Sequence, residues 1–344
     1  MELPEEIIVE ILKFSWGNDK KSFETMAATC KLIRRISRGH QFTDCFKCPN
    51  HDTLKSVLRE DHLTCYKWSY NRVIEPDVDQ LCIDASKSGS LKIVKYLVPL
   101  GSNIHANDDQ AIQLASKKGH LGVVKFLVSL GANIHANNDY ATRLASKRGH
   151  LQVVKFLVSL GANIHADNDR AIQSASKNGH LEIVKFLVES GAKIHAGDSS
   201  PLQSASKNGH LEVVKFLVSL GAKIHAYHDH AVRLASEYGH LQVVKFLVES
   251  GANIHALNDD VIRVAADNGH LEVVKFLVSL GVNIHTMNDY AIQTASSHGH
   301  LEVVKFLVSS GANINHWAVE MASGNGHKKV AKYLVAVAEF RQNY

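Results

Sequence analysis

A nine-residue string recurs every 30 residues along most of this 344-residue chain. It reads His-Leu-x-Val-Val-Lys-Phe-Leu-Val, with Ile183 replacing the first valine in one copy, and its copies begin at His120, His150, His180, His210, His240, His270 and His300. A short repeat cannot bury its apolar side alone, whereas a stack of repeats buries a continuous core. The sequence therefore predicts an array of stacked repeats rather than two or three globular domains.

The repeat over residues 137–166 predicts a helix-turn-helix. Ala141, Leu144 and Ala145 have i, i+3, i+4 spacing, which places them on one face of a helix. Gly149 is expected to end that helix, because glycine adopts the left-handed conformation most easily. Each repeat therefore begins with an amphipathic first helix.

A second helix is predicted over residues 151–160, with Val153, Val154 and Leu157 on its apolar side. Asp139 precedes the first helix at the position where an N-cap carboxylate accepts from a free backbone N–H. Gly161 is expected to stop the second helix in the same way as Gly149 stops the first.

The predicted fold class is all-α, an α-solenoid of stacked helix-turn-helix repeats with a small helical head. The final segment carries Lys328 and Lys329 where other repeats have Leu-Glu or a related pair, which suits a terminal repeat facing water. The predicted divisions are a helical head over residues 1–45, a linker and degenerate capping repeat over residues 46–76, eight 30-residue repeats over residues 77–316 and a C-terminal capping repeat over residues 317–344.

The recurring pattern Ala-Ser-x-x-Gly-His-x-x-Val-Val-x-x-Leu-Val-x-x-Gly-Ala-x-Ile resembles the ankyrin family across about four-fifths of the chain. The repeat is shorter than the family's ~33 residues, and Thr-Pro-Leu-His survives only as Ser200–Gln203. The short repeats with Gly-Ala-Asn-Ile-His-Ala are most similar to the ankyrin arrays of giant DNA viruses of amoebae. The resemblance implies a protein-binding module with a concave groove.

The first forty residues do not follow the repeat. Their Leu-Pro-x-Glu-Ile-x-x-x-Ile-Leu pattern resembles an F-box, a segment that docks on the Skp adaptor of cullin-type ubiquitin ligases. That family usually has a tryptophan where Ile33 stands. The alternative is a plain helical cap, and the array would then be a passive scaffold or a sequestering decoy. On the F-box resemblance, the adaptor-docking residues are Leu3, Pro4, Ile7, Ile11 and Leu12.

Comparison of the repeats with one another shows a nearly constant second helix and a variable first helix. Random drift of exposed positions after duplication is one explanation, and a binding groove is the other. The resemblance places these positions in the concave groove, where the N-terminal half is basic and calls for an acidic patch on the partner. The predicted partner-binding residues are Lys117, Lys118, Tyr140, Arg143, Lys147, Arg148, Arg170, Lys177, Lys207, His230, Tyr238, Asp260 and Tyr290.

No motif of an enzyme is found, and no cofactor is predicted. Most of the histidines recur in Gly-His and Ile-His positions, which indicates a framework role, since repeats about 10 Å apart cannot share a zinc ion. A zinc site remains open at Cys45, Cys48, His62 and Cys65, although His62 and Cys65 also fit a degenerate repeat. The charge of the predicted groove changes from positive to negative along its length, which disfavours binding of nucleic acid.

The five cysteines all lie within the first 82 residues. Their odd number and clustering fit no disulfide framework, so we expect an intracellular and cytoplasmic protein, in the host cell if it is viral. The acidic start is not a secretory signal, and no stretch approaches the ~20 apolar residues of a membrane span. The sequence does not predict the oligomeric state.

Overall fold

The computed structural model describes residues 78–195 and 200–343, and every regular element in those two ranges is a helix. The chain divides into two compact units, an N-terminal unit ending at Ala141 and a C-terminal unit beginning at Thr142. The predicted head, the degenerate repeat and the possible zinc site lie outside the described residues. In chain order the helices are α4 (Val78–Ser88), α5 (Leu91–Leu97), the 3-10 helix η1 (Val98–Leu100), α6 (Ala106–Lys118), α7 (Leu121–Ser129), α8 (Ala136–Arg148), α9 (Leu151–Ser159), α10 (Ala166–Lys177), α11 (Leu181–Glu189), α12 (Pro201–Lys207), α13 (Leu211–Ser219), α14 (Ala226–Glu237), α15 (Leu241–Glu249), α16 (Ala256–Asp267), α17 (Leu271–Ser279), α18 (Thr286–Ser297), α19 (Leu301–Ser309), α20 (His316–Gly324) and α21 (Lys328–Asn343).

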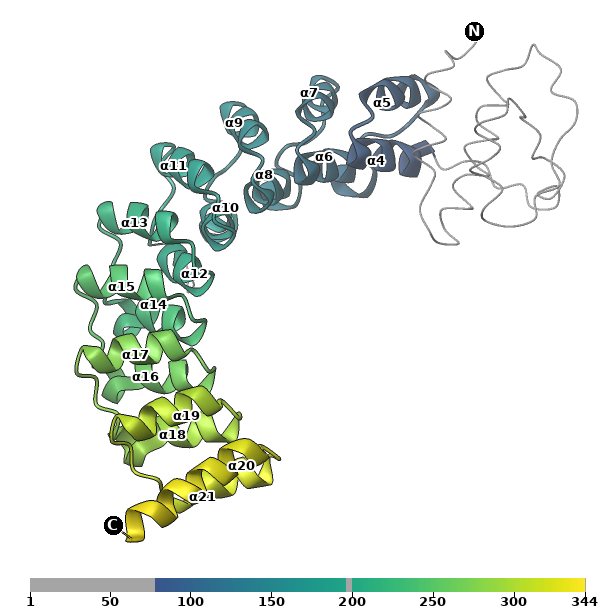
Figure 1. Ribbon diagram of the computed structural model, residues 1–344. Coiled ribbons are helices and arrows are strands. Elements are labelled where there is room, and N and C mark those ends of the chain that lie inside the picture. The colour runs from purple at the N-terminus through teal and green to yellow at the C-terminus, as the bar shows by residue number, and fades with distance from the viewer. Residues whose placement is uncertain (1–77, 196–199, 344) are drawn as a thin grey trace, which may run out of the picture. The chain divides into compact units, whose positions relative to one another are not determined.

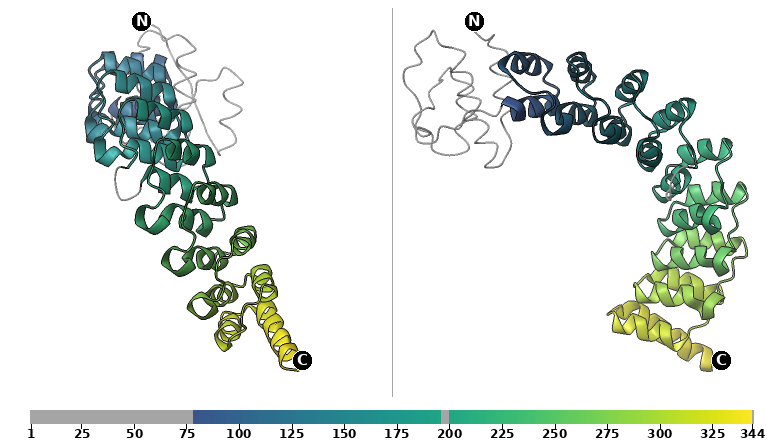
Figure 2. Two further views of the ribbon diagram at one scale, coloured as in Figure 1. Left: turned by 90° about the vertical axis from the view of Figure 1, so that its left-hand side faces the viewer. Right: turned by 180° about the vertical axis from the view of Figure 1, so that it is seen from behind.

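Each repeat is a pair of helices, and successive pairs stack side by side within the C-terminal unit (Figures 1 and 2). The first helices form one layer, in which α14 packs on α16 and α16 packs on α18. The second helices form the other layer, in which α13 packs on α15 and α17 packs on α19. The all-α solenoid predicted from the 30-residue period is confirmed.

The core lies between the two layers. Ala145 is fully buried on the first helix of its repeat, and Val153, Val154 and Leu157 are buried on the second. Ile164, in the following turn, is also buried. The apolar faces predicted from helical spacing are therefore the buried ones, and burial of each valine or leucine contributes about 1.5–3 kcal/mol.

Glycine ends the first helix of each repeat, as the Gly-His pattern predicts. Gly149 has a φ of 86°, in the left-handed region. A Cβ at Gly149 would lie 2.8 Å from Cε1 of His180 in the next repeat, because that imidazole ring lies against the glycine. Glycine is thus required both for backbone conformation and for the close approach of the ring.

The N-cap role predicted for Asp139 is wrong. Asp139 ends a turn of three left-handed residues and has φ 54° and ψ 38°, whereas an N-cap residue is usually extended. Its carboxylate oxygen lies 2.9 Å from Nδ1 of His135. Asn and Asp tolerate the left-handed region better than most residues, which explains the Asn-Asn-Asp spelling of this turn.

The equivalent aspartates connect repeats. In the C-terminal unit, Oδ1 of Asp229 accepts from the backbone N–H of Asn253, in the next turn, at 2.8 Å. The same oxygen lies 2.9 Å from Nδ1 of His225. Side-chain N-caps do occur at Ser200, which accepts from the N–H of Gln203 at 3.3 Å, and at Asn315.

Within the described ranges, no helix has the length and apolar character that crossing a lipid bilayer would require.

Candidate protein-binding surface

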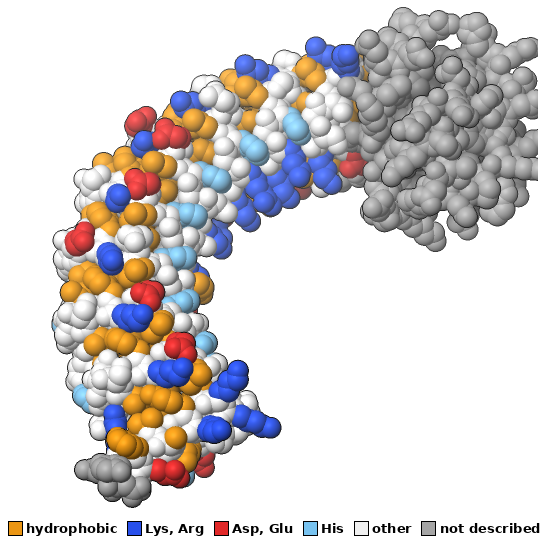
Figure 3. Space-filling view, viewed as in Figure 1, with side chains coloured by type: hydrophobic (Ala, Val, Ile, Leu, Met, Phe, Trp, Pro, Cys, Tyr) orange, Lys and Arg blue, Asp and Glu red, His pale blue; other side chains and the backbone are white. Residues whose placement is uncertain are grey.

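Positively charged side chains cluster at the C-terminal ends of the first helices in the first repeats of the C-terminal unit. Lys147 and Arg148 end α8, Lys177 ends α10 and Lys207 ends α12, and all four side chains are exposed. Arg170, near the start of the right-handed part of α10, is exposed as well. We call these five residues the basic row. Blue side chains gather along the edge of the first-helix layer near α8 and α10 in Figure 3.

Members of the basic row differ in their local partners. Nζ of Lys207 lies 4.8 Å from the centroid of the Tyr238 ring, and the hydrogen bond with the Tyr238 hydroxyl raises the pKa of Lys207. Arg170 donates to Oε1 of Gln173 at 3.4 Å. For Lys147, Arg148 and Lys177, the described residues provide no side-chain ion pair or hydrogen bond. These three cations therefore carry charge that the described parts of the fold leave uncompensated.

Two of the predicted partner-binding residues are engaged within the array. Arg143 is partly buried and pairs with Asp167 of the next repeat. The carboxylate of Asp260 accepts from Nε of Arg233 at 2.9 Å and from Nε of Arg263 at 2.6 Å. Both side chains thus link neighbouring repeats, whether or not they also meet a partner.

The remaining predicted residues vary in exposure. Tyr238 and Tyr290 are exposed in the C-terminal unit, and Tyr140 is exposed at the end of the N-terminal unit. His230 is partly buried, and this burial lowers its pKa. In the N-terminal unit Lys118 is exposed and Lys117 is partly buried.

Sequence reasoning missed a set of apolar side chains at the turns before the first helices. Tyr227, Leu257 and Met287 stand at equivalent positions and are 60%, 49% and 64% exposed. The first two helices of this type in the described chain carry asparagine at that position, at Asn107 and Asn137. The change from polar to apolar along the array was a signal in the sequence, but only the structure shows that the side chains face solvent.

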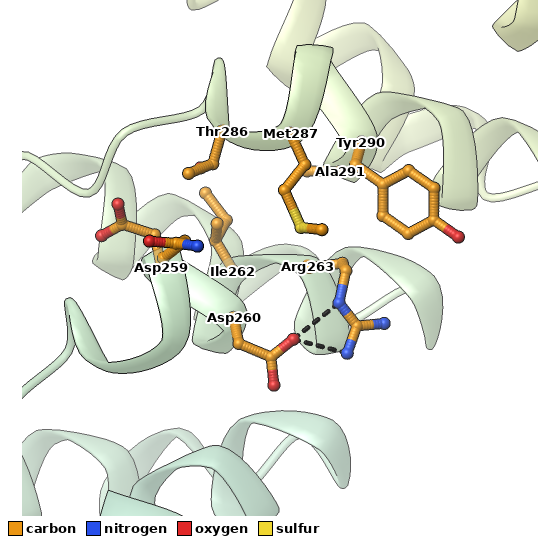
Figure 4. Close-up of a pocket in the computed structure, with 9 residues that line it drawn as sticks. Asp259, Asp260, Ile262, Arg263, Thr286, Met287, Tyr290 and Ala291 are labelled. Carbon is orange, nitrogen blue, oxygen red and sulfur yellow. Dashed lines mark hydrogen bonds and ion pairs between the residues drawn. The ribbon is translucent and has the colours of Figure 1, made fainter. Parts of the chain in front are cut away.

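A small pocket lies between α16 and α18, beside the last of these turns (Figure 4). Ile262, Met287 and Tyr290 contribute apolar walls, and Asp260 and Arg263 contribute the charged edge. In Figure 4, Met287 projects from α18 toward the ion pair of Asp260 with Arg263 on α16, and the Tyr290 ring extends to one side. The pocket's volume of about 10 Å³ is room for about one water molecule, so a partner side chain can contact only its exposed rim.

A family model described as ankyrin repeats (three copies) matches residues 64–138, 81–168, 135–198, 175–258 and 262–343. The chain belongs to the ankyrin-repeat family. No curated protein matches it. The comparisons lend no support to the likeness to giant-virus arrays or to the F-box resemblance of the head, and both stay predictions.

The histidines of this ankyrin array have framework geometry. His210 Nε2–H donates to the backbone oxygen of Lys177 in the preceding repeat at 3.0 Å, and His240 donates in the same way to Lys207. Burial is the main cause that lowers the pKa of His210. Among the described residues, no three histidine, cysteine or acidic side chains gather as a metal site would require.

Proposed function

We propose that this ankyrin array binds an acidic surface of a protein partner through the basic row. Ankyrin repeats are protein-interaction modules, and proteins of this kind are typically binding scaffolds without an enzymatic centre. The basic row, formed by Lys147, Arg148, Arg170, Lys177 and Lys207, is a set of five exposed cations on the variable first helices. Opposite charge on a partner accelerates association and selects against partners of the same sign.

The observation that carries the proposal is the contrast between paired and unpaired cations on the same layer of helices. Arg143 pairs with an aspartate of the next repeat. Arg233 and Arg263 share the carboxylate of Asp260. Lys147, Arg148 and Lys177 have no such acid among the described residues. Like charges on adjacent repeats repel one another, so their accumulation without counter-charges favours a role in recognition.

Aromatic and histidine side chains of the C-terminal unit accompany the basic row. Tyr238 lies beside Lys207 at the end of the basic row, and tyrosine is a common anchor in interfaces because it buries a large area at low entropic cost. Lys117 and Lys118 give the N-terminal unit the same sign of charge. Within the C-terminal unit, His230 is a further contact residue of the proposal.

The test uses the full chain and a displayed library of random peptides. We expect selected peptides to be rich in Asp and Glu, and to lose at least tenfold in affinity when Lys147→Glu, Arg148→Glu and Lys177→Glu are combined. The matched control combines Lys328→Glu, Lys329→Glu and Lys332→Glu on α21, which imposes the same change in net charge on another exposed helix. Equal losses in both triple variants would show a non-specific charge effect and would contradict the proposal.

Nucleic acid is the main competing ligand for a basic row. Duplex DNA and duplex RNA serve as counter-probes, because binding to phosphates weakens steeply and linearly on a log–log plot of affinity against salt. Selected peptides should compete with one another and should bind in the presence of excess duplex. Displacement of the peptides by either duplex at physiological salt would make nucleic acid the better candidate.

The head contributes a second, finer part of the proposal. The Leu3-Pro4 start and the Ile7, Ile11 and Leu12 pattern support docking on the Skp adaptor of a cullin-type ubiquitin ligase, with the array recruiting the partner for modification. Binding of the full chain to purified Skp adaptor, lost in Leu3→Ala/Pro4→Ala, is the expected result. A well-folded chain that does not bind the adaptor would instead favour a scaffold or sequestering role.

A further inference from the structure

The turns before α14, α16 and α18 combine left-handed backbone with large exposed apolar side chains. Tyr227, Leu257 and Met287 have φ values of 55°, 54° and 52°. Bulky residues rarely adopt this conformation, whereas asparagine and aspartate do so more readily. The chain itself uses Asn107, Asn137 and Asp167 at the equivalent positions of other repeats.

These three side chains, called the turn-tip row, form a regular line along the C-terminal unit. Their helices are neighbours in the first-helix layer, since α14 packs on α16 and α16 packs on α18. Packed helices lie 8–10 Å apart, so successive members of the row are spaced by about that distance. Seven residues of an α-helix rise about 10.5 Å, so side chains at i, i+7 and i+14 match this spacing.

The charged groups beside the row present cations outward. Asp260 lies between Arg233 and Arg263 and is enclosed by them, with 11% of its side chain exposed against 32% for Arg263. Asp259, which also lines the pocket, directs its carboxylate to His255 at 2.6 Å. A partner that approaches Met287 therefore meets a guanidinium before it meets a carboxylate.

We propose that the turn-tip row docks an amphipathic α-helix of a partner protein, with apolar residues at seven-residue intervals and acidic residues beside them. One apolar side chain packs on the exposed Met287 and Tyr290 at the rim of the pocket between α16 and α18. A neighbouring carboxylate pairs with Arg263. This inference rests on the proposed function only in that the occupant is a protein, because it assigns a surface separate from the basic row.

The repeat sequence supplies a variant that preserves the fold. Tyr227→Asn, Leu257→Asn and Met287→Asn together install the residue found at Asn107 and Asn137, which suits the left-handed turn. This triple variant should have a thermal midpoint at or above that of the unchanged chain. A loss of binding in it is therefore a loss of contact and not of folding.

The experiment measures fluorescence anisotropy of helical peptides selected from the displayed library on the full chain. We expect peptides with apolar residues at i, i+7 and i+14 and flanking acids, whose affinity falls at least tenfold in the triple asparagine variant and several-fold in Arg263→Gln. Their affinity should change less than threefold when Lys147, Arg148 and Lys177 are replaced by glutamate. Because that last variant changes only the basic row, it separates failure of this proposal from failure of the proposed function.

Three results would overturn the proposal. Selection could yield no peptide of this pattern, or peptides that bind the asparagine variant equally well. Sedimentation could show that the unchanged chain self-associates and the variant does not, which would make a second copy the occupant. Vesicles of neutral lipid could bind the chain through the same three residues, which would make the row a membrane contact.

Discussion

At the scale of single residues, each Gly-His pair is a joint between two repeats. A Cβ on Gly179 would lie 2.5 Å from Nδ1 of His210, and Nε2–H of His210 donates to the oxygen of Lys177. Because a carbonyl oxygen only accepts, the proton of the neutral ring is on Nε2. A second proton would have to be placed on Nδ1, which lies against the glycine.

Acidification should therefore weaken these joints. Burial lowers the pKa of His210 and of His300 below the ordinary value of about 6.5, so the unfolded chain takes up protons first as the pH falls. These neutral rings make their full contribution to the free energy of unfolding above pH ~6.5. That contribution decreases as the pH falls below that value and through the lower pKa of the folded state. Urea unfolding at pH 8 and at pH 5.5 measures the loss, and His210→Gln should reduce the pH dependence. The same pH dependence in both proteins would show that His210 does not contribute.

The helix-ending glycines and the buried alanine, valine and leucine positions are predictable from the sequence. Each follows from a single physical rule, either the left-handed conformation that glycine allows or the spacing of apolar residues on one face of a helix. Gly149 was recognised as a helix end, and Val153, Val154 and Leu157 as a buried face. Asp139 was assigned wrongly, because an acid before a helix is the usual N-cap signal and three consecutive left-handed residues have no common signature. The exposure of Leu257 and Met287 was not predictable, since an apolar residue beside a repeat boundary is more often buried.

At the scale of helices, the recurring lysines of the second helices have one of two partners, a glutamate of the same helix or a phenylalanine ring of the next repeat. Lys185 pairs with Glu182, one turn earlier, at 2.8 Å. Lys155 has Gln152 at the equivalent position, and its Nζ instead lies 5.6 Å from the centroid of the Phe186 ring in the next repeat. The residue three positions earlier therefore decides whether a lysine binds within its own helix or across to the next one.

Gln152→Glu should move Lys155 from the Phe186 ring to the new carboxylate. An i, i+3 ion pair contributes about 0.2–0.5 kcal/mol and an exposed cation–π contact about 0.5–1 kcal/mol, so the free energy of unfolding should change by less than about 1 kcal/mol. The readout is NMR of labelled lysine, in which the ring-current shift of the Lys155 ε-methylene disappears. Glu182→Gln is the reciprocal control and should move Lys185 onto Phe216. An unchanged shift in the first variant would contradict this account.

At the scale of the whole molecule, the connections between repeats involve nearest neighbours. Asp229 reaches Asn253, 24 residues later, and His240 reaches back to Lys207, 33 residues earlier. Arrays of this kind behave as chains of locally coupled units. Damage to one joint should therefore remain near that joint.

Gly209→Val provides the test of local coupling. The substitution adds a β-branched side chain at φ 76° and 2.5 Å from Nδ1 of His240, which should destabilise that joint by about 1–3 kcal/mol or more. Hydrogen exchange should show lost protection in α12 to α15 and retained protection in α18 to α21. Gly221→Val is the control. It imposes the same left-handed strain on valine, because Gly221 has φ 82°, but no neighbouring side chain lies close to the new Cβ. Uniform loss of protection across the array would contradict nearest-neighbour coupling.

The fixed 24- and 33-residue offsets of these joints have a consequence for how such a gene can change. Removing or inserting 90 base pairs, one repeat in frame, recreates every aspartate and histidine joint at the new junction. One repeat inserted between Lys207 and Tyr227 would shift the two candidate surfaces by about one helix spacing, 8–10 Å, and leave each intact. Unequal recombination that adds whole repeats can therefore change the distance between the two binding surfaces, and so match a different spacing of epitopes on a partner, without changing the residues of either surface.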